Sequence, residues 1–268
     1  VGPCQRACPA QMDIPRMLRQ MVDGDWQGAT ATVKQDIALP AILGRICPAP
    51  CEKACRRGHA DTPLAICLLK RAVADADLAA ATPHVPDPAP PTGKSVAVVG
   101  AGPTGLAAAY HLRLGGHACT IFEGRAALGG AMRHAIAPDR LPPAVIDQEV
   151  ATIIAMGVTC HTDWQLETSA QLDDLLARFD AVALAVGPVD SGWLTRLGLT
   201  AGRHGIHVDH GIYQTSRPQV FAAGAAIAVC RMAARAVADG KRMAAAIDAA
   251  LHGHAPEPFR HRFSSSVG

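Results

Sequence analysis

Residues 95–123, SVAVVGAGPTGLAAAYHLRLGGHACTIFE, combine a strand run, a glycine-rich turn, an Ala-rich helix and a second strand in one short segment. The strand runs are Ser95–Val99 and Ala118–Glu123, and the glycine turn begins at Gly100. This order within about 30 residues is typical of a βαβ unit, in which a crossover helix joins two parallel strands. The segment therefore predicts an α/β fold built on a parallel sheet.

The turn has the pattern G-x-G-x-x-G, with Gly100, Gly102 and Gly105 flanking the pair Pro103-Thr104. The first glycine permits the tight turn, the second lets a pyrophosphate approach the backbone, and the third lets the helix pack on the strand. The helix N-terminus favours phosphate, and Glu123 can accept hydrogen bonds from a ribose diol. A dinucleotide site is predicted, against the alternative of a glycine turn that binds nothing.

The rest of the chain divides at a proline-rich linker. Before the linker, short helices are expected at 12–22, 26–34 and 63–78. After it, helices are expected at 141–156, 172–179 and 229–251, and strands at 158–161, 181–186 and 220–223. We predict an all-α N-terminal domain (1–80), a stiff linker (81–94), a Rossmann-type domain with a parallel sheet (95–255) and a tail (256–268).

Composition excludes several classes of protein. Of the 268 residues, 49% are hydrophobic and 18% are charged, which excludes a disordered chain. A net charge of +2 does not favour a nucleic acid partner. No stretch approaches 18 uninterrupted apolar residues, so no transmembrane helix is expected. The opening VGPCQRACPAQ does not resemble a signal peptide, so a cytoplasmic protein without disulfides is expected.

The cysteines are concentrated at the front of the chain. Six of nine lie in the first 67 residues, at Cys4, Cys8, Cys47, Cys51, Cys55 and Cys67. Grouped thiolates suit iron–sulfur clusters or zinc. Zinc ribbons use C-x2-C pairs, which this chain lacks, and a redox-active metal fits a dinucleotide domain better. Iron–sulfur ligands are therefore favoured over structural zinc and over unligated core cysteines.

Several segments together resemble one family: CPAQMDIP, GRICPAPCEKAC, VAVVGAGPTGLAAAYHL, FEGRAALGGAMRHAIAPDRLP and RPQVFAAGA. They are similar, in order and over nearly the whole chain, to the glutamate synthase small-subunit family of flavoproteins, which includes the N-terminal part of dihydropyrimidine dehydrogenase. The resemblance implies a helical domain with two [4Fe–4S] clusters, an FAD domain and an NAD(P)H domain.

The same resemblance implies which residues bind FAD. They are Gly100, Gly102, Pro103, Thr104, Gly105, Glu123, Gly129, Gly130, Arg133, Gly187, Gly224 and Ala225. Ala225 stands where the family has an Asp that contacts FAD. The loss of one charge-assisted hydrogen bond costs about 1.5–3 kcal/mol, which weakens FAD binding without abolishing it.

The resemblance also implies the cluster ligands. Cys8, Cys47 and Cys51 match three ligands of one cluster, and the fourth, a Glu or Gln in the family, matches Lys70, which has no lone pair while protonated. Cys67, one helical turn earlier, is predicted to replace it.

Two further cysteines, Cys4 and Cys55, match two ligands of a second cluster, whose remaining C-x2-C pair would precede Val1. One cluster is therefore expected. The second is absent, completed ahead of Val1, or completed by another chain.

The family's NAD(P)H domain has little room here. Only residues 188–216, 29 in number, separate Ala185-Val186-Gly187 from the final FAD segment, whereas such a domain needs roughly 100 residues. We therefore expect an electron-transfer flavoprotein subunit of a multi-subunit oxidoreductase, inactive alone, that passes electrons between FAD and [4Fe–4S] clusters and partner subunits. The alternatives are a stand-alone flavin oxidoreductase acting on a small substrate and a non-catalytic docking subunit with a degenerate FAD site.

Overall fold

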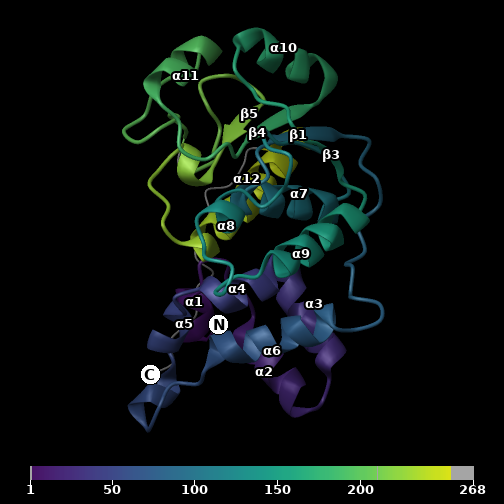
Figure 1. Ribbon diagram of the computed structural model, residues 1–268, viewed down its shortest axis with the longest axis vertical. Helices are drawn as coiled ribbons and strands as arrows, with labels where there is room; N and C mark the ends of the chain where they lie inside the picture. The colour runs from purple at the N-terminus through teal and green to yellow at the C-terminus, as the bar shows by residue number, and fades with distance from the viewer. Residues whose placement is uncertain (1, 210, 255–268) are drawn as a thin grey trace.

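The computed structural model describes residues 2–209 and 211–254, so the predicted tail, 256–268, lies outside the described residues. The chain forms two parts, a helical part (residues 2–79) below a sheet part (residues 95–254) in Figure 1. The helical part contains α1 (Pro3–Ala7), α2 (Ile14–Val22), α3 (Trp26–Asp36), α4 (Pro40–Ile46), α5 (Pro50–Lys53), η1 (Arg56–His59) and α6 (Ile66–Leu78).

Side-chain caps fix two of these helices. The Asp13 carboxylate accepts a hydrogen bond from Arg16 N at 3.1 Å and begins α2, as sequence capping rules predict. Asp25 does the same for α3 through Gly28 N at 2.8 Å. Helix α4 was not expected from sequence, and it is buried along nearly its whole length. It begins at a proline, which suits the first turn of a helix because its N–H would have no partner there.

The sheet part is built on five parallel strands in the order β3-β2-β1-β4-β5. The strands are β1 (Ser95–Val99), β2 (Ala118–Phe122), β3 (Thr159–His161), β4 (Ala181–Leu184) and β5 (Val220–Ala222). The connecting helices are α7 (Pro103–Leu114), α8 (Ala131–His134), α9 (Pro143–Ala155), α10 (Ser169–Arg178), α11 (Ser191–Leu197), η2 (Gly224–Ala226) and α12 (Ala233–Leu251). The predicted α/β fold with a parallel sheet is confirmed.

Five helix starts differ from the sequence prediction. Helices α2, α6 and α9 begin two or three residues later than predicted, at Ile14, Ile66 and Pro143 and not at 12, 63 and 141. Helix α10 begins at Ser169 and not at 172, because Thr168 and Gln171 form a capping box. Helix α12 begins at Ala233 and not at 229, because its N-cap residue, Met232, has an extended backbone. Cys230 therefore precedes this helix and does not open it.

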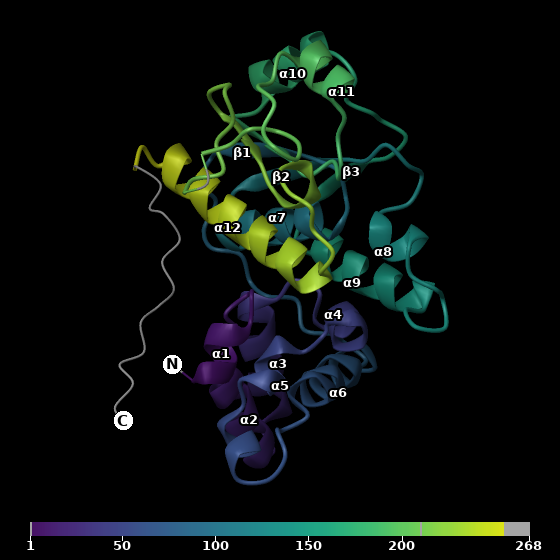
Figure 2. The ribbon, with the colours of Figure 1, turned by 90° about the vertical axis from the view of Figure 1, so that its left-hand side faces the viewer.

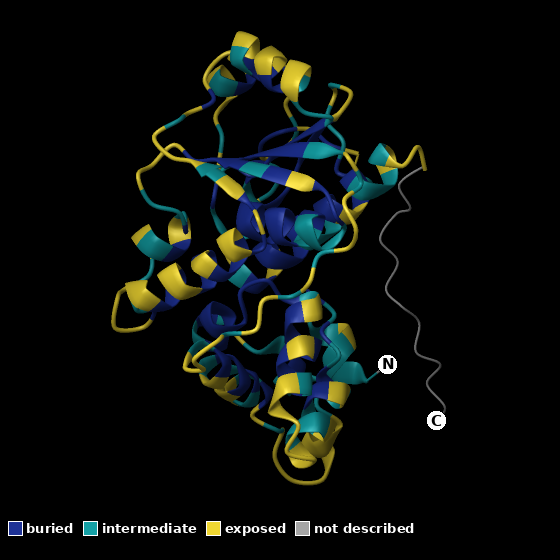
Figure 3. Cartoon of the chain, turned by 90° about the vertical axis from the view of Figure 1, so that its right-hand side faces the viewer, coloured by how far each residue is buried: buried dark blue, intermediate teal, exposed yellow. Residues whose placement is uncertain are grey.

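Each face of the sheet packs a separate apolar cluster. One cluster contains α7, α9 and α12 and continues into the helical part through residues such as Met17 and Leu43. The other cluster, with α10 and α11, lies on the opposite face. Figure 2 shows α12 running between the sheet and the helical part, and Figure 3 shows the buried residues reaching from one part into the other. None of the described helices is long and apolar enough to cross a membrane.

The boundary between the two parts also contains buried charge. Lys34 of α3 and Asp77 of α6 form an ion pair at 2.5 Å, with side-chain exposures of 5% and 6%. The Tyr110 hydroxyl of α7 donates to Lys34 O at 2.6 Å, and Lys241 of α12 pairs with Asp36 at 2.5 Å. The helical part is therefore joined to the sheet part by specific polar contacts as well as apolar packing.

We predict that Lys34→Met lowers the free energy of unfolding by about 3–5 kcal/mol, because it leaves the Asp77 carboxylate buried without its cation. Urea denaturation measures the change. Arg178→Ala is the control, since it breaks an ion pair with Asp174 in which both side chains are more than half exposed. Equal stability of the two variants would contradict the prediction.

Candidate functional site

The glycine turn after β1 is packed tightly at two positions and open at a third. Gly100 has a φ of +98°, and a Cβ there would lie 2.5 Å from Ala185 O. A Cβ at Gly105 would lie 1.8 Å from Gly100 O, whereas nothing lies within 4 Å of a Cβ at Gly102. The first and third glycines therefore hold the turn closed, and the second leaves space in front of the backbone.

Three other segments meet this turn at the carboxyl edge of the sheet. Gly129 N donates to Ala101 O at 2.9 Å, and a Cβ at Gly130 would lie 2.7 Å from Gly102 Cα. A Cβ at Gly224 would lie 2.2 Å from Thr104 Oγ1. Glycines far apart in the sequence are thus brought to one place, next to the point between β1 and β4 where ligands of doubly wound sheets bind.

Glu123 supports the same turn from the end of β2. Its side chain is buried, Oε2 accepts from Ala101 N at 2.7 Å, and Oε1 accepts from Arg125 N at 3.0 Å. A carboxylate has about four acceptor positions, so each oxygen retains capacity for a ribose hydroxyl. Glu123 can therefore both brace the turn and bind a ligand.

A polar cleft of about 1250 Å³, its open mouth included, extends from this turn. Gly100 and Glu123 line it together with residues that motif reading missed: Arg125, Trp164, Asp190, Trp193 and Arg196. The Trp193 indole N–H donates to Leu166 O at 2.9 Å, which fixes the ring at the wall of the cleft. Of these five residues, only Arg125 could have been found from the sequence, because it lies two residues after Glu123. The other four reach the cleft only because residues 164–196 fold back toward the glycine turn.

Of the predicted FAD residues, Gly100 and Glu123 line this cleft and the other ten do not. Arg133, Ala225 and Gly187 are three of those ten. Arg133 Nε donates to Leu128 O at 2.9 Å, and its Nη2 pairs with Asp147 of α9. Ala225 lies in η2 and has no polar side-chain group. Gly187 follows β4 with a φ of +81°, and nothing lies within 4 Å of a Cβ placed there.

A second cavity lies in the helical part and is lined by four of the front cysteines. Cys8 ends α1, Cys47 ends α4, Cys51 lies in α5 and Cys67 lies in the first turn of α6. The cavity holds about 420 Å³, its opening included, and its other lining residues are mostly apolar. All nine cysteines are free thiols. The fold therefore gathers thiols that are up to 59 positions apart in the sequence.

The spacing of these sulfurs indicates the kind of metal centre. A single zinc ion binds sulfur at about 2.3 Å, which brings its ligands within about 4 Å of one another. Among the described residues, no three cysteine sulfurs lie within 4.8 Å of one another. The four thiols share one cavity without forming such a compact three-sulfur group, and grouped thiolates of this kind are the ligands of iron–sulfur clusters.

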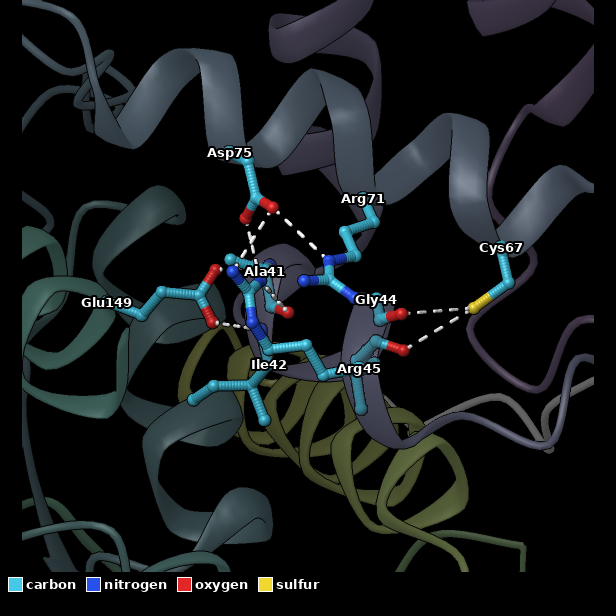
Figure 4. A network of polar contacts seen from close by, with 9 residues as sticks. Ala41, Ile42, Gly44, Arg45, Cys67, Arg71, Asp75 and Glu149 are labelled. Carbon is cyan, nitrogen blue, oxygen red and sulfur yellow. Dashed lines mark hydrogen bonds and ion pairs between the residues drawn. The ribbon is translucent and has the colours of Figure 1, made fainter. Parts of the chain in front are cut away.

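Cys67 contacts the end of α4 (Figure 4). Its N–H donates to Glu52 Oε1 at 2.9 Å, and its Sγ lies 3.6 Å from Leu43 O and 3.7 Å from Gly44 O, at the end of α4. A hydrogen bond from the Cys67 thiol lowers the pKa of Cys47, and the charge of Lys70 adds to this effect. Burial raises the pKa of Cys51 to about 12. Lys70 itself is buried and lines the cavity.

The other two front cysteines lie outside this cavity. Cys4 in α1 and Cys55 after α5 are half-buried, and α1 packs against α5. Burial raises the pKa of Cys4, and the charges of Cys55 and Cys8 act in the same direction. These two thiols are therefore close to each other and beside the main cavity.

One helix joins the cysteine cavity to the sheet part. Glu149 of α9 accepts hydrogen bonds from Ala41 N at 2.6 Å and Ile42 N at 2.9 Å, at the N-terminus of α4 (Figure 4). Complete burial raises the pKa of Glu149 to about 7, and the two backbone N–H groups oppose the shift. The opposite end of α4 carries Cys47 into the cysteine cavity. Helix α4 is thus anchored by the sheet part at one end and forms the cavity at the other.

Comparison with known proteins agrees with both sites. Residues 1–82 match the family described as dihydropyrimidine dehydrogenase domain II, 4Fe-4S cluster, and residues 66–244 match the pyridine nucleotide-disulphide oxidoreductase family. The fold and sites define a class of flavin- and iron–sulfur-dependent oxidoreductases. The chain belongs to the pyridine nucleotide-disulphide oxidoreductase family, and its N-terminal region is of the 4Fe–4S type. The expected cofactors, FAD and a [4Fe–4S] cluster, are confirmed at the level of the family.

Three curated relatives show where such chains occur. The chain is 37% identical to the beta subunit of NADP(+)-dependent formate dehydrogenase from Moorella thermoacetica, a match that covers 69% of this chain and 29% of the relative. It is also 37% identical to the NAD-dependent dihydropyrimidine dehydrogenase subunit PreT from Salmonella typhimurium, over 69% and 45% of the two chains. The glutamate synthase [NADPH] small chain from Bacillus subtilis is 31% identical, over 67% and 36%.

These relatives confirm the resemblance to the glutamate synthase small-subunit family. The chain spans less than half the length of each of the three.

We predict that two glycine substitutions affect FAD differently. Gly102→Ala should leave the thermal stability of the FAD-free protein unchanged, because its methyl group meets no protein atom, but should reduce FAD binding at least tenfold by occupying the approach of the pyrophosphate. Gly105→Ala should lower both, since its methyl group would meet Gly100 O. Thermal denaturation and fluorescence titration with FAD measure the two effects. Normal FAD affinity in Gly102→Ala would refute this reading of the turn.

Proposed function

We propose that this chain is an electron-transfer subunit that holds FAD and one [4Fe–4S] cluster and passes electrons to and from partner subunits of an oxidoreductase complex. The observation that carries the proposal is the anchoring of α4: Glu149 of the sheet part caps the helix that delivers Cys47 to the cysteine cavity. Electron transfer between two cofactors needs a fixed separation, and a buried helix capped in this way supplies it. The relatives, which are named as subunits, support a partner complex.

The cluster is assigned to Cys8, Cys47, Cys51 and Cys67. The support is their common cavity and the hydrogen bonds that hold Cys67 between Glu52 and the end of α4. Lys70 lines the cavity with Cys67, so its ammonium group is an electrostatic neighbour of the cluster and not a ligand. A positive charge beside an anionic cluster favours the reduced state and raises its potential.

Cys4 and Cys55 are assigned to a separate position beside the first cluster. Their proximity and exposure suit two ligands of a second cluster that residues outside these two would complete. This part of the proposal states where a second cluster would bind and does not require one for the function.

FAD is assigned to the carboxyl edge of the sheet. The Gly100–Gly105 turn and the N-terminus of α7 would hold the pyrophosphate, and Glu123 would hold the ribose of the adenosine half in the polar cleft. Gly129, Gly130 and Gly224 press against this turn and would border the flavin half. When bound, FAD exchanges electrons singly or in pairs. The residues of this chain would bind and orient the FAD.

No nicotinamide domain is assigned to this chain. The segment between β4 and β5 folds into α11 and a few isolated β-bridges, and its residues Asp190, Trp193 and Arg196 line the polar cleft. The segment therefore supports the FAD site, and a separate NAD(P)H-binding βαβ unit needs roughly 100 residues. We infer that electrons reach the flavin from another subunit.

We also infer that the linker at 81–94 is the boundary between the helical domain and the FAD domain.

A reducing compartment suits this assignment. All nine cysteines are free, and exposed thiols and thiolate-ligated clusters persist where disulfide formation is suppressed. We therefore place the protein in the cytoplasm.

A coulometric titration of the purified, anaerobic holoprotein tests the function. The proposal predicts about three electrons per chain, two on the flavin and one on a single cluster. Uptake of only two electrons would leave a flavoprotein without a working cluster, and no uptake would indicate a docking subunit. Turnover of a small substrate by the isolated chain would favour a stand-alone oxidoreductase.

The fourth cluster ligand gives a sharper prediction. Cys67→Ala should lower the iron content of the purified protein and change its visible and EPR spectra, because the cavity would retain three thiolates. Cys160→Ala, which removes a half-buried thiol in β3, is the matched control and should leave iron unchanged. Identical iron content and spectra for both variants would contradict the assignment of Cys67.

A further inference from the structure

Three metal-ligating side chains meet on the sheet part, at the C-terminal end of α12. His117 Nε2 lies 2.8 Å from Asp248 Oδ1, and His252 Nδ1 lies 3.3 Å from the same oxygen. The three ligand atoms lie within 4.8 Å of one another. Ligands of a four-coordinate ion with bonds of about 2.0–2.2 Å lie about 3.3–3.6 Å apart. The His252–Asp248 separation already fits this range, and the His117–Asp248 pair, now at hydrogen-bond distance, would widen slightly around an ion.

The buried member of this group is oriented from its far side. His117 is fully buried, and its Nδ1 lies 2.7 Å from Thr92 Oγ1, at the end of the proline-rich linker. In the metal-bound state the tautomer with the proton on Nδ1 would donate to Thr92, and Nε2, which now hydrogen-bonds Asp248, would offer its lone pair to the ion. Metal-binding histidines characteristically use their second nitrogen in this way.

The group is also accessible and favours positive charge. The Asp248 and His252 side chains are 48% and 46% exposed, so a cation can reach them from solvent. Helix α12 is 19 residues long and ends at Leu251, which places the partial negative charge of its C-terminal carbonyls beside the group. His252 Nδ1 now contacts Asp248 O at 2.9 Å, a contact that an ion would replace.

We propose that His117, Asp248 and His252 form a binding site for a divalent transition-metal ion, zinc in the first instance, that is separate from the cysteine cavity. Two imidazole nitrogens and one carboxylate oxygen are a donor set that zinc accepts, and water would complete the coordination. The ion would tie the end of α12 to Thr92 of the linker and to His117 at the entry to β2. The site is therefore structural, and it does not depend on the electron-transfer function.

Calorimetric titration of Zn²⁺ into the holoprotein, with its thiols occupied by the cluster, tests the proposal. Wild type should bind one equivalent that His252→Ala loses or binds at least tenfold more weakly. Thr92→Val should also weaken this binding by about tenfold, because loss of an orienting partner typically costs 10–100-fold in metal affinity. His204→Ala, which removes an exposed imidazole elsewhere on the sheet part, should bind as wild type does.

Zn²⁺ should also raise the melting temperature of wild type and of His204→Ala but not that of His252→Ala. Cysteine-bound zinc would appear equally in all variants, so only the difference between variants reports on this site. Indistinguishable isotherms for wild type and His252→Ala would overturn the proposal, as would tight binding that Thr92→Val and His252→Ala both retain.

Discussion

The capping of α4 by Glu149 is the contact on which the arrangement of the molecule depends. The first N–H groups of a helix have no partner within the helix and must be satisfied when they are buried. In α4, the Glu149 carboxylate satisfies Ala41 N and Ile42 N from the other part of the chain. Because the far end of α4 presents Cys47, this one carboxylate sets the position of the cysteine cavity relative to the sheet. The Tyr110 hydroxyl, which donates to Lys34 O, and the Lys241–Asp36 ion pair cross the same interface.

The sequence predicted the parts of the fold that are encoded locally. The alternation of strand and helix and the glycine pattern at Gly100–Gly105 each lie within a few residues, so β1 and α7 were expected where they occur. Helices α4 and α11 were missed because short apolar or mixed segments carry little periodic signal. The role of Glu149 was not predictable in this way, since the residues it contacts are 107 and 108 positions away.

The candidate sites show the same division. The concentration of six cysteines at the front of the chain predicted metal ligands. The fold brings Cys8, Cys47, Cys51 and Cys67 to one cavity and leaves Cys4 and Cys55 beside it. Glu123 was expected to bind a ribose, and it also braces the turn through Ala101 N. Trp193 and Arg196 belong to the segment 188–216, to which the sequence assigned no site residue, yet they line the polar cleft. Such roles arise from tertiary packing, which no local pattern specifies.

The central claim is that this chain relays electrons between its own cofactors without a nicotinamide site of its own. Anaerobic titration of the isolated holoprotein with NADPH, NADH and dithionite, followed by visible absorbance, tests it most directly. We expect dithionite to bleach both the flavin and the cluster bands, whereas neither nicotinamide should do so at stoichiometric concentration. Stoichiometric bleaching of the flavin by NADPH or NADH would show a functional nicotinamide site in this chain and would contradict the account.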